Sequence, residues 1–177
     1  MLTTVVPHNL VVTIRMAAAL YNIGRLDMMA IARIESNFNP AAKNPHSTAT
    51  GLYQFIDATA RRYGIDPRDP TQSAGAAALM AYQNRIHLLK HAHVGIGSNL
   101  YLAHQQGPSR AVKILGAALG EHPLSPRDLR LMEMNVPATS LAGFLKEDTD
   151  EHKAIYFLNV WSDKFAEAGR AWAVGDA

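Results

Sequence analysis

Apolar side chains recur every three or four residues through most of the chain, the spacing that places them on one face of an α-helix. No segment keeps the strict alternation of apolar and polar residues that is typical of a half-buried strand. The pattern therefore predicts an all-α protein with about seven to nine helices. The expected helices cover residues 10–20, 27–38, 57–63, 72–91, 99–106, 109–119 and 127–134, with a last long one that includes residues 155–165.

The segments between these helices are short, apart from a loop over residues 39–50 that is rich in Pro, Asn, Ser and Thr. This loop has room for a small β-hairpin. Another stretch contains Pro123, Pro126 and Pro137 and is expected to be rich in turns. No internal repeat, linker or low-complexity tract interrupts the pattern, so we expect one domain over residues 1–177.

The helix expected at residues 27–38 carries a carboxylate on its apolar face, at Glu35. Pro40 forbids a long continuation, so Glu35 lies in the last turn, at the negative end of the helix dipole. Burial and this dipole would both raise the pKa of Glu35, as a general acid near neutral pH requires. A small rotation of the helix would instead bring Glu35 to solvent. The apolar members of the face are Met28, Ile31, Ala32 and Phe38.

The amino-acid composition is that of a globular protein and excludes some kinds of function. Hydrophobic residues make up 48% and charged residues 18% of the chain, a globular balance rather than a disordered one. The net charge of +2 would suit an anionic polymer but is too small to indicate a nucleic-acid-binding protein. The chain has no cysteine, which excludes disulfides and thiol chemistry.

The apolar run at residues 10–20 is the only candidate for a targeting or membrane segment. It lacks a basic leader, Arg15 interrupts it, and it is too short to span a bilayer. We therefore expect no signal peptide and no integral membrane segment. On this interpretation the protein is made in the cytoplasm of a cell.

Three motifs, in this order, resemble those of soluble lytic transglycosylases and goose-type lysozymes, which cleave peptidoglycan. They are Glu35-Ser36 at a helix end, Gly51-Leu-Tyr-Gln54 one loop later, and Ala103-His-Gln-Gln-Gly107 further on. The resemblance covers roughly residues 10–115. It implies a lysozyme-like domain with a cleft between two helical lobes, in which residues 120–177 complete the helical fold.

The resemblance also implies roles for the residues of the first two motifs. Glu35 would be the catalytic acid/base, and Ser36 would hold its carboxyl group or touch the substrate. Gly51 would let the backbone pass close to the glycan. Tyr53 and Gln54 would line the substrate-binding site, where Gln54 would hydrogen-bond to sugar or acetamido groups.

The third motif departs from the family pattern. His104 and Gln105 occupy the positions at which the family usually has Tyr and Asn. Both keep hydrogen-bonding capacity, but the phenol is lost. Tyr101, one turn earlier, could supply a phenol to the substrate or could simply pack in the core.

The reaction implied is cleavage of the β-1,4 bond between N-acetylmuramic acid and N-acetylglucosamine. A transglycosylase would give 1,6-anhydro-muramic ends, and attack by water would make the enzyme a lysozyme. A second carboxylate would favour hydrolysis, and Asp57 is the nearest candidate, although a helix cap is its more common role. A third alternative is an inactive module that only binds peptidoglycan.

The partners implied are the glycan strands of peptidoglycan, without a cofactor or metal. We expect a monomer of the phage endolysin type, which a holin would release to the cell wall or a virion would carry. One alternative is a metalloprotein, because His87 and His91 are four residues apart and His93 is close. However, Leu88 follows His87 where a zinc protease helix needs a glutamate.

Overall fold

The computed structural model describes residues 6–173 and confirms the all-α prediction. Within these residues it contains nine helices and no strand. The chain divides into two compact units, residues 1–83 with 165–177 and residues 84–164. The division does not test the prediction of a single domain over residues 1–177, which stays a prediction. Residues 1–5 and 174–177 of that range lie outside the described residues.

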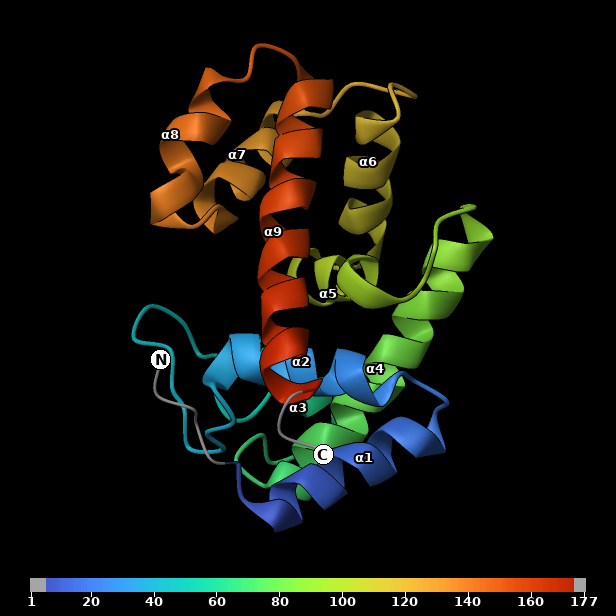
Figure 1. The fold of residues 1–177 in the computed structure, drawn as a ribbon, viewed down its shortest axis with the longest axis vertical. Coiled ribbons are helices and arrows are strands. Elements are labelled where there is room, and N and C mark those ends of the chain that lie inside the picture. Colours follow the sequence, from blue (N-terminus) through green and yellow to red (C-terminus); the bar gives the residue numbers. More distant parts are fainter. Residues whose placement is uncertain (1–5, 174–177) are drawn as a thin grey trace. The chain divides into compact units, whose positions relative to one another are not determined.

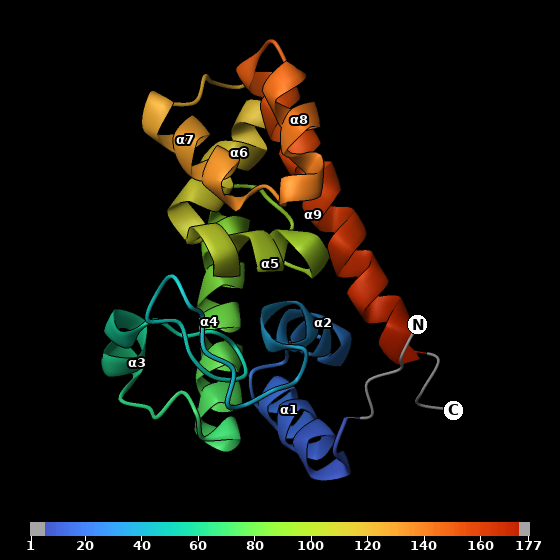
Figure 2. The same cartoon turned by 90° about the vertical axis from the view of Figure 1, so that its left-hand side faces the viewer.

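The first unit contains α1 (His8–Leu20), α2 (Arg25–Ser36), α3 (Asp57–Tyr63) and most of α4 (Pro70–Lys90). It also contains the last part of α9 (Asp150–Ala173). Helices α1 and α2 pack side by side (Figures 1 and 2). The largest fully buried side chains of this unit are Ile14, Met28, Met29, Ile31, Leu52 and Tyr53.

The second unit contains α5 (Gly97–Gln106), α6 (Pro108–Ala118), α7 (Pro126–Asn135) and α8 (Ala138–Lys146), with the first part of α9. Helix α5 packs on α6, and α7 packs on α8. Their common core is formed by Leu88, Leu102, Ile114, Met132, Phe144 and Phe157, all nearly or fully buried.

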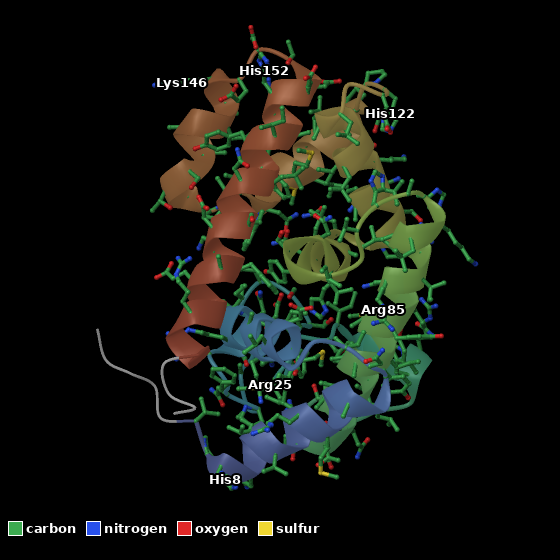
Figure 3. All side chains as sticks on the ribbon, turned by 45° about the vertical axis from the view of Figure 1, so that its right-hand side comes forward. His8, Arg25, Arg85, His122, Lys146 and His152 are labelled. Carbon is green, nitrogen blue, oxygen red and sulfur yellow. The ribbon has the colours of Figure 1, made fainter. Side chains whose placement is uncertain are left out.

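A polar pair of side chains lies at the start of α9 in the second unit. The Nδ1 atom of His152, a residue labelled in Figure 3, lies 2.8 Å from a carboxylate oxygen of Asp148. The hydrogen bond between them raises the pKa of His152 and lowers the pKa of Asp148. Both side chains are exposed, so this pair contributes little to stability.

Helix α8 was not predicted from the sequence, because the three prolines around it indicated turns. In the structure Pro137 is the N-cap of α8, and Pro126 lies in the first turn of α7. Proline is tolerated there because the first residues of a helix have no intrahelical partner for their N–H groups. Pro126 and Pro137 thus mark the starts of two helices rather than turns alone.

The loop after α2 contains antiparallel pairing but no strand. Two isolated bridges pair Lys43 with Thr50 and Thr50 with Phe55. The hairpin for which the sequence left room is therefore reduced, within the described residues, to these two bridges. None of the described helices has the length and apolar character needed to cross a membrane.

Candidate active site

Glu35 lies in the last turn of α2, one residue before the end of the helix. The helix ends because Asn37 and Phe38 adopt left-handed conformations, with φ of 49° and 62°. Met28, Ile31 and Ala32 on the same face are buried, and Glu35 is half-buried. Its side chain is thus neither enclosed in the core nor fully exposed to solvent. The sequence had left open burial on the apolar face or exposure to solvent, and the observed position is between the two. The raised pKa stays a prediction.

Ser36 connects the end of α2 to the second motif. Its Oγ lies 2.8 Å from the carbonyl oxygen of Leu52 and 3.1 Å from that of Ala32. A hydroxyl has one hydrogen to donate, so it serves one of these carbonyls at a time. Ser36 therefore positions the Glu35 turn against the following segment, a role that the resemblance did not specify.

Gly51 is required by a close approach of two backbone segments. Its φ is +84°, and a Cβ at this position would lie 1.7 Å from the carbonyl oxygen of Pro67. Its N–H donates to the carbonyl of Ala42 at 2.8 Å. The contact with Pro67 by itself explains the glycine, so a close approach of the glycan stays a prediction.

The side chain of Tyr53 is fully buried. Its hydroxyl donates to the carbonyl of Met28 in α2 at 3.2 Å, and burial raises the pKa of the phenol. The structure thus gives this side chain a place in the core. A contact of the kind predicted for Tyr53 would have to involve its backbone.

Gln54 is half-buried and adopts a positive φ of 50°. Its Nε2 donates to the carbonyl of Gly51 at 2.9 Å and lies 3.4 Å from that of Ala42. None of the described residues donates to its Oε1. The backbone therefore orients the carboxamide, and its oxygen remains available to accept a hydrogen bond from a ligand.

The third motif belongs to the second unit and lies on α5. The ring of Tyr101 is buried and nearly parallel to that of His104, with 6.3 Å between centroids and an angle of 18°. The Trp161 ring lies 5.4 Å from Tyr101. The ring of Tyr101 therefore packs within the second unit, while a contact of its phenol with the substrate stays a prediction. His104 is half-buried, as is Gln105, whose Oε1 accepts from Nε2 of Gln106 at 3.0 Å.

The corner that follows this motif is held by an ion pair. Gly107, at φ +80°, joins α5 to α6. Arg110 donates from Nη1 to the carbonyl of Gln106 at 3.2 Å and from Nε to the Asp128 carboxylate at 3.3 Å. The Ser125 hydroxyl, which lies 2.6 Å from this carboxylate, is the main cause that lowers the pKa of Asp128.

The histidine cluster gains no support as a metal site. The rings of His87 and His91 lie 4.8 Å apart. Among the residues described, no three His, Cys, Asp or Glu side chains are placed to hold a metal ion.

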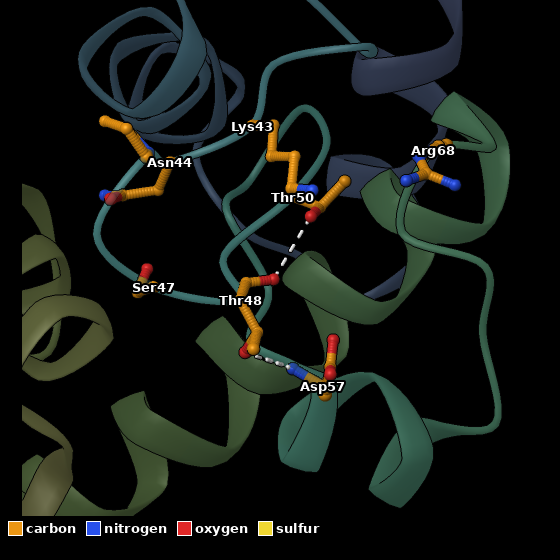
Figure 4. A pocket seen from close by; sticks show the side chains of 8 residues that line it. Lys43, Asn44, Ser47, Thr48, Thr50, Asp57 and Arg68 are labelled. Atoms are coloured by element: carbon orange, nitrogen blue, oxygen red, sulfur yellow. Dashed lines mark hydrogen bonds between the residues drawn. The ribbon is translucent and has the colours of Figure 1, made fainter.

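A polar hollow of about 680 Å³ lies beside the second motif, and sequence reasoning singled out only one of its residues. Its charged lining residues are Lys43, Asp57 and Arg68, and the rest of its wall comes from the polar loop 44–50 (Figure 4). Asp57 was expected to cap α3, but it is the first residue of the helix and the N-cap is Ile56; the N–H of Asp57 donates to the Thr48 hydroxyl instead. The only signal for the hollow in the sequence was the polar composition of the loop.

The structure thus places Glu35, Ser36, Gly51, Tyr53 and Gln54 together in the first unit and the third motif in the second. The family model of the transglycosylase SLT domain matches residues 12–103. The matched range contains Glu35 and Gln54 and ends just before His104. No curated protein sequence matches the chain. Because the model matches more than half of the chain, the protein belongs to the transglycosylase SLT family and is a peptidoglycan lytic transglycosylase.

Proposed function

We propose that Glu35 alone performs the acid and base steps of this reaction. The observation that carries the proposal is the position of Glu35, half-buried in the last turn of α2 beside a fully buried face. Partial burial and the negative end of the helix dipole both favour the neutral form of a carboxyl group. A neutral carboxyl group can donate the proton that the leaving oxygen needs.

In the first step, Glu35 donates its proton to the glycosidic oxygen while the bond from C1 of N-acetylmuramic acid to that oxygen breaks. The 2-acetamido group of the substrate assists at C1. In the second step, the 6-hydroxyl oxygen of the same sugar bonds to C1 and gives its proton to the Glu35 carboxylate. Atoms and charges balance, no water or cofactor is consumed, and the product carries a 1,6-anhydro ring.

Gln54 contributes binding rather than proton transfer in this proposal. Its Oε1 is held in a fixed direction by the two backbone contacts of Nε2. An acetamido N–H is a suitable donor to this oxygen. Gln54→Ala should raise the barrier to cleavage by about 1–2 kcal/mol, the contribution of one hydrogen bond. An unchanged kcat/KM would remove Gln54 from the site.

Mass spectrometry of digested peptidoglycan tests the mechanism. The anhydro product is one water lighter than the product of a lysozyme, so we expect lighter fragments from the wild type. Glu35→Gln should reduce turnover by about 10²–10⁴-fold, the usual contribution of a general acid or base, with an unchanged circular dichroism spectrum. Fragments of the hydrolysed mass would indicate a lysozyme. A wild type no faster than Glu35→Gln would indicate a binding module.

We further propose that the enzyme acts as a monomer in phage-type lysis or entry, reaching the cell wall through a holin or within a virion. The support is family analogy and the location of peptidoglycan outside the cytoplasmic membrane. Expression in a bacterial cytoplasm should cause lysis only when a holin is expressed with it. Lysis without the holin would contradict this route, and a dimer in sedimentation analysis would contradict the monomer.

A further inference from the structure

We infer that the hollow beside the second motif binds the peptide stem that N-acetylmuramic acid carries in peptidoglycan. The inference rests on the proposed function, because it assigns a further part of the same substrate to a further part of the same unit. The stem is a short peptide with free carboxylates, and its diamino acid adds an amine. The hollow, at about 680 Å³, falls within the usual size range of small-molecule sites, about 300–1,000 Å³.

The charges that line the hollow suit this ligand. Lys43 and Arg68 contribute two cations, and Asp57 contributes one carboxylate. No carboxylate in the described part of the chain pairs with either cation. Figure 4 shows Lys43 and Asp57 on opposite sides, with Thr48 and Thr50 between them. The two cations would bind stem carboxylates, and Asp57 would bind the amine.

The wall between these charged groups is already ordered by its own hydrogen bonds. The Thr50 hydroxyl donates to the carbonyl of Thr48 at 3.1 Å, and the Thr48 hydroxyl accepts from the N–H of Asp57 at 3.1 Å. The bridge between Lys43 and Thr50 fixes the base of the Lys43 side chain. This wall therefore loses little conformational entropy when a ligand binds, and the low entropic cost favours affinity.

The hollow is also continuous with the segment that carries Gln54. Thr50 lines the hollow and directly precedes Gly51. Ala42, next to Lys43, accepts from the N–H of Gly51 at 2.8 Å. A sugar that contacts Gln54 would therefore have its peptide substituent close to the hollow.

Direct binding tests the site without requiring catalysis. The probe is the synthetic tripeptide of L-alanine, γ-linked D-glutamate and a diamino acid, titrated calorimetrically into full-length Glu35→Gln protein. Adding Lys43→Ala and Arg68→Ala should weaken binding by about ten-fold or more, since both charge-assisted hydrogen bonds to the stem carboxylates are lost. The matched control adds Arg15→Ala and Arg61→Ala instead, two exposed arginines of the same unit outside the hollow. Equal affinity of the two variants, or no binding to Glu35→Gln itself, would overturn the inference.

Asp57 can be tested separately. With both peptides acetylated at the alanine nitrogen, Asp57→Asn should weaken binding of the tripeptide but leave the L-alanyl-γ-D-glutamate dipeptide unchanged, because then only the tripeptide carries a free amine. An equal loss for both peptides would overturn the assignment of Asp57.

Kinetic measurements then test whether the hollow contributes to cleavage. With Glu35 intact, the Lys43→Ala/Arg68→Ala protein should lose about ten-fold in kcat/KM on peptide-bearing strands and nothing on strands stripped by an amidase. An equal loss on both substrates, or no loss on either, would contradict the inference. A wild type that cleaves neither substrate, with normal tripeptide binding by Glu35→Gln, would instead contradict the proposed function alone.

Discussion

The first two motifs and the third differ in how the protein holds them. In the first unit, motif residues act on the backbone: Ser36 bonds to the carbonyl of Leu52, and Gly51 touches the carbonyl of Pro67. In the second unit, His104 and Gln105 project from a regular helix, where His104 contacts the Tyr101 ring and Gln105 accepts from the Gln106 side chain. Substitution therefore has different consequences in the two regions.

The extent of the family match is in line with this difference. A residue that fixes the backbone can change only if the chain around it moves, whereas a helix presents almost any side chain without altering its course. The family match contains the backbone-fixing residues Ser36 and Gly51 and ends at residue 103. His104 and Gln105, the positions that differ from the family pattern, follow directly.

The largest effect is expected at the backbone contact of Gly51. Gly51→Ala should lower the free energy of unfolding by about 3 kcal/mol or more, because it combines an unfavourable φ with a collision against Pro67. Gly64→Ala is the matched control, since Gly64 has a similar φ of +64° but open space around it. It should cost only about 1–2 kcal/mol. Equal losses in denaturant titrations would show that the contact with Pro67 is unimportant.

The second effect concerns the corner after the third motif. Asp128→Asn should cost about 2 kcal/mol, because it weakens the pairing of a buried carboxylate with Arg110 and Lys113. The pKa of Asp128 is lowered in the folded protein from its usual 3.8. Its contribution to stability is therefore complete above that value and is lost as the pH falls below it. Denaturant titration at several pH values should show the difference from wild type shrinking below about pH 4.

Asp163→Asn is the control for this prediction, since Asp163 is exposed and lies in the same unit. A difference that persists unchanged at low pH would mean that the charge of Asp128 does not matter.

Ser36→Ala should have an intermediate effect, about 1–2 kcal/mol, because it leaves the carbonyl of Leu52 without its donor. Activity should fall with it, since the hydroxyl positions the turn that carries Glu35. Thermal unfolding and kcat measure the two effects, with the exposed Ser162→Ala as control. Normal stability with lost activity would instead place Ser36 in contact with substrate.

The smallest effect is expected on α5, where a substitution changes side chains without changing the course of the backbone. His104→Tyr with Gln105→Asn restores the family pattern on α5, and the new ring can still lie along Tyr101. We expect kcat to rise by about three- to ten-fold, the value of roughly one hydrogen bond. A decrease would show that His104 or Gln105 has a role of its own in this enzyme.

The sequence predicted the helices well because their signal is local. The predicted end of the Glu35 helix lies within two residues of Ser36, where α2 ends. The missed helix α8 begins at Ala138, directly after Pro137, and the sequence alone does not distinguish a proline before a helix from a proline in a turn.

The site was predicted less completely, since its contacts are not local. The spacing in the second motif did not indicate that the Tyr53 hydroxyl would donate to the carbonyl of Met28 in α2. The hollow assembles Lys43, Asp57 and Arg68 from three separate parts of the chain. The bridges of the loop, the hydrogen bond between Asp57 and Thr48, and the contact between Gly51 and Pro67 bring these parts together.

The contact of Gly51 with Pro67 has a practical consequence for engineering. Residues 56–66, which include α3 with its buried Ala60, connect the buried Phe55 to that contact. The two anchor points of this segment are set by the rest of the unit, and the entropy of closing a loop grows only slowly with its length. Residues 56–66 can therefore be replaced by segments of different length or charge. Such replacements are expected to change the substrate selectivity of the enzyme without displacing Glu35.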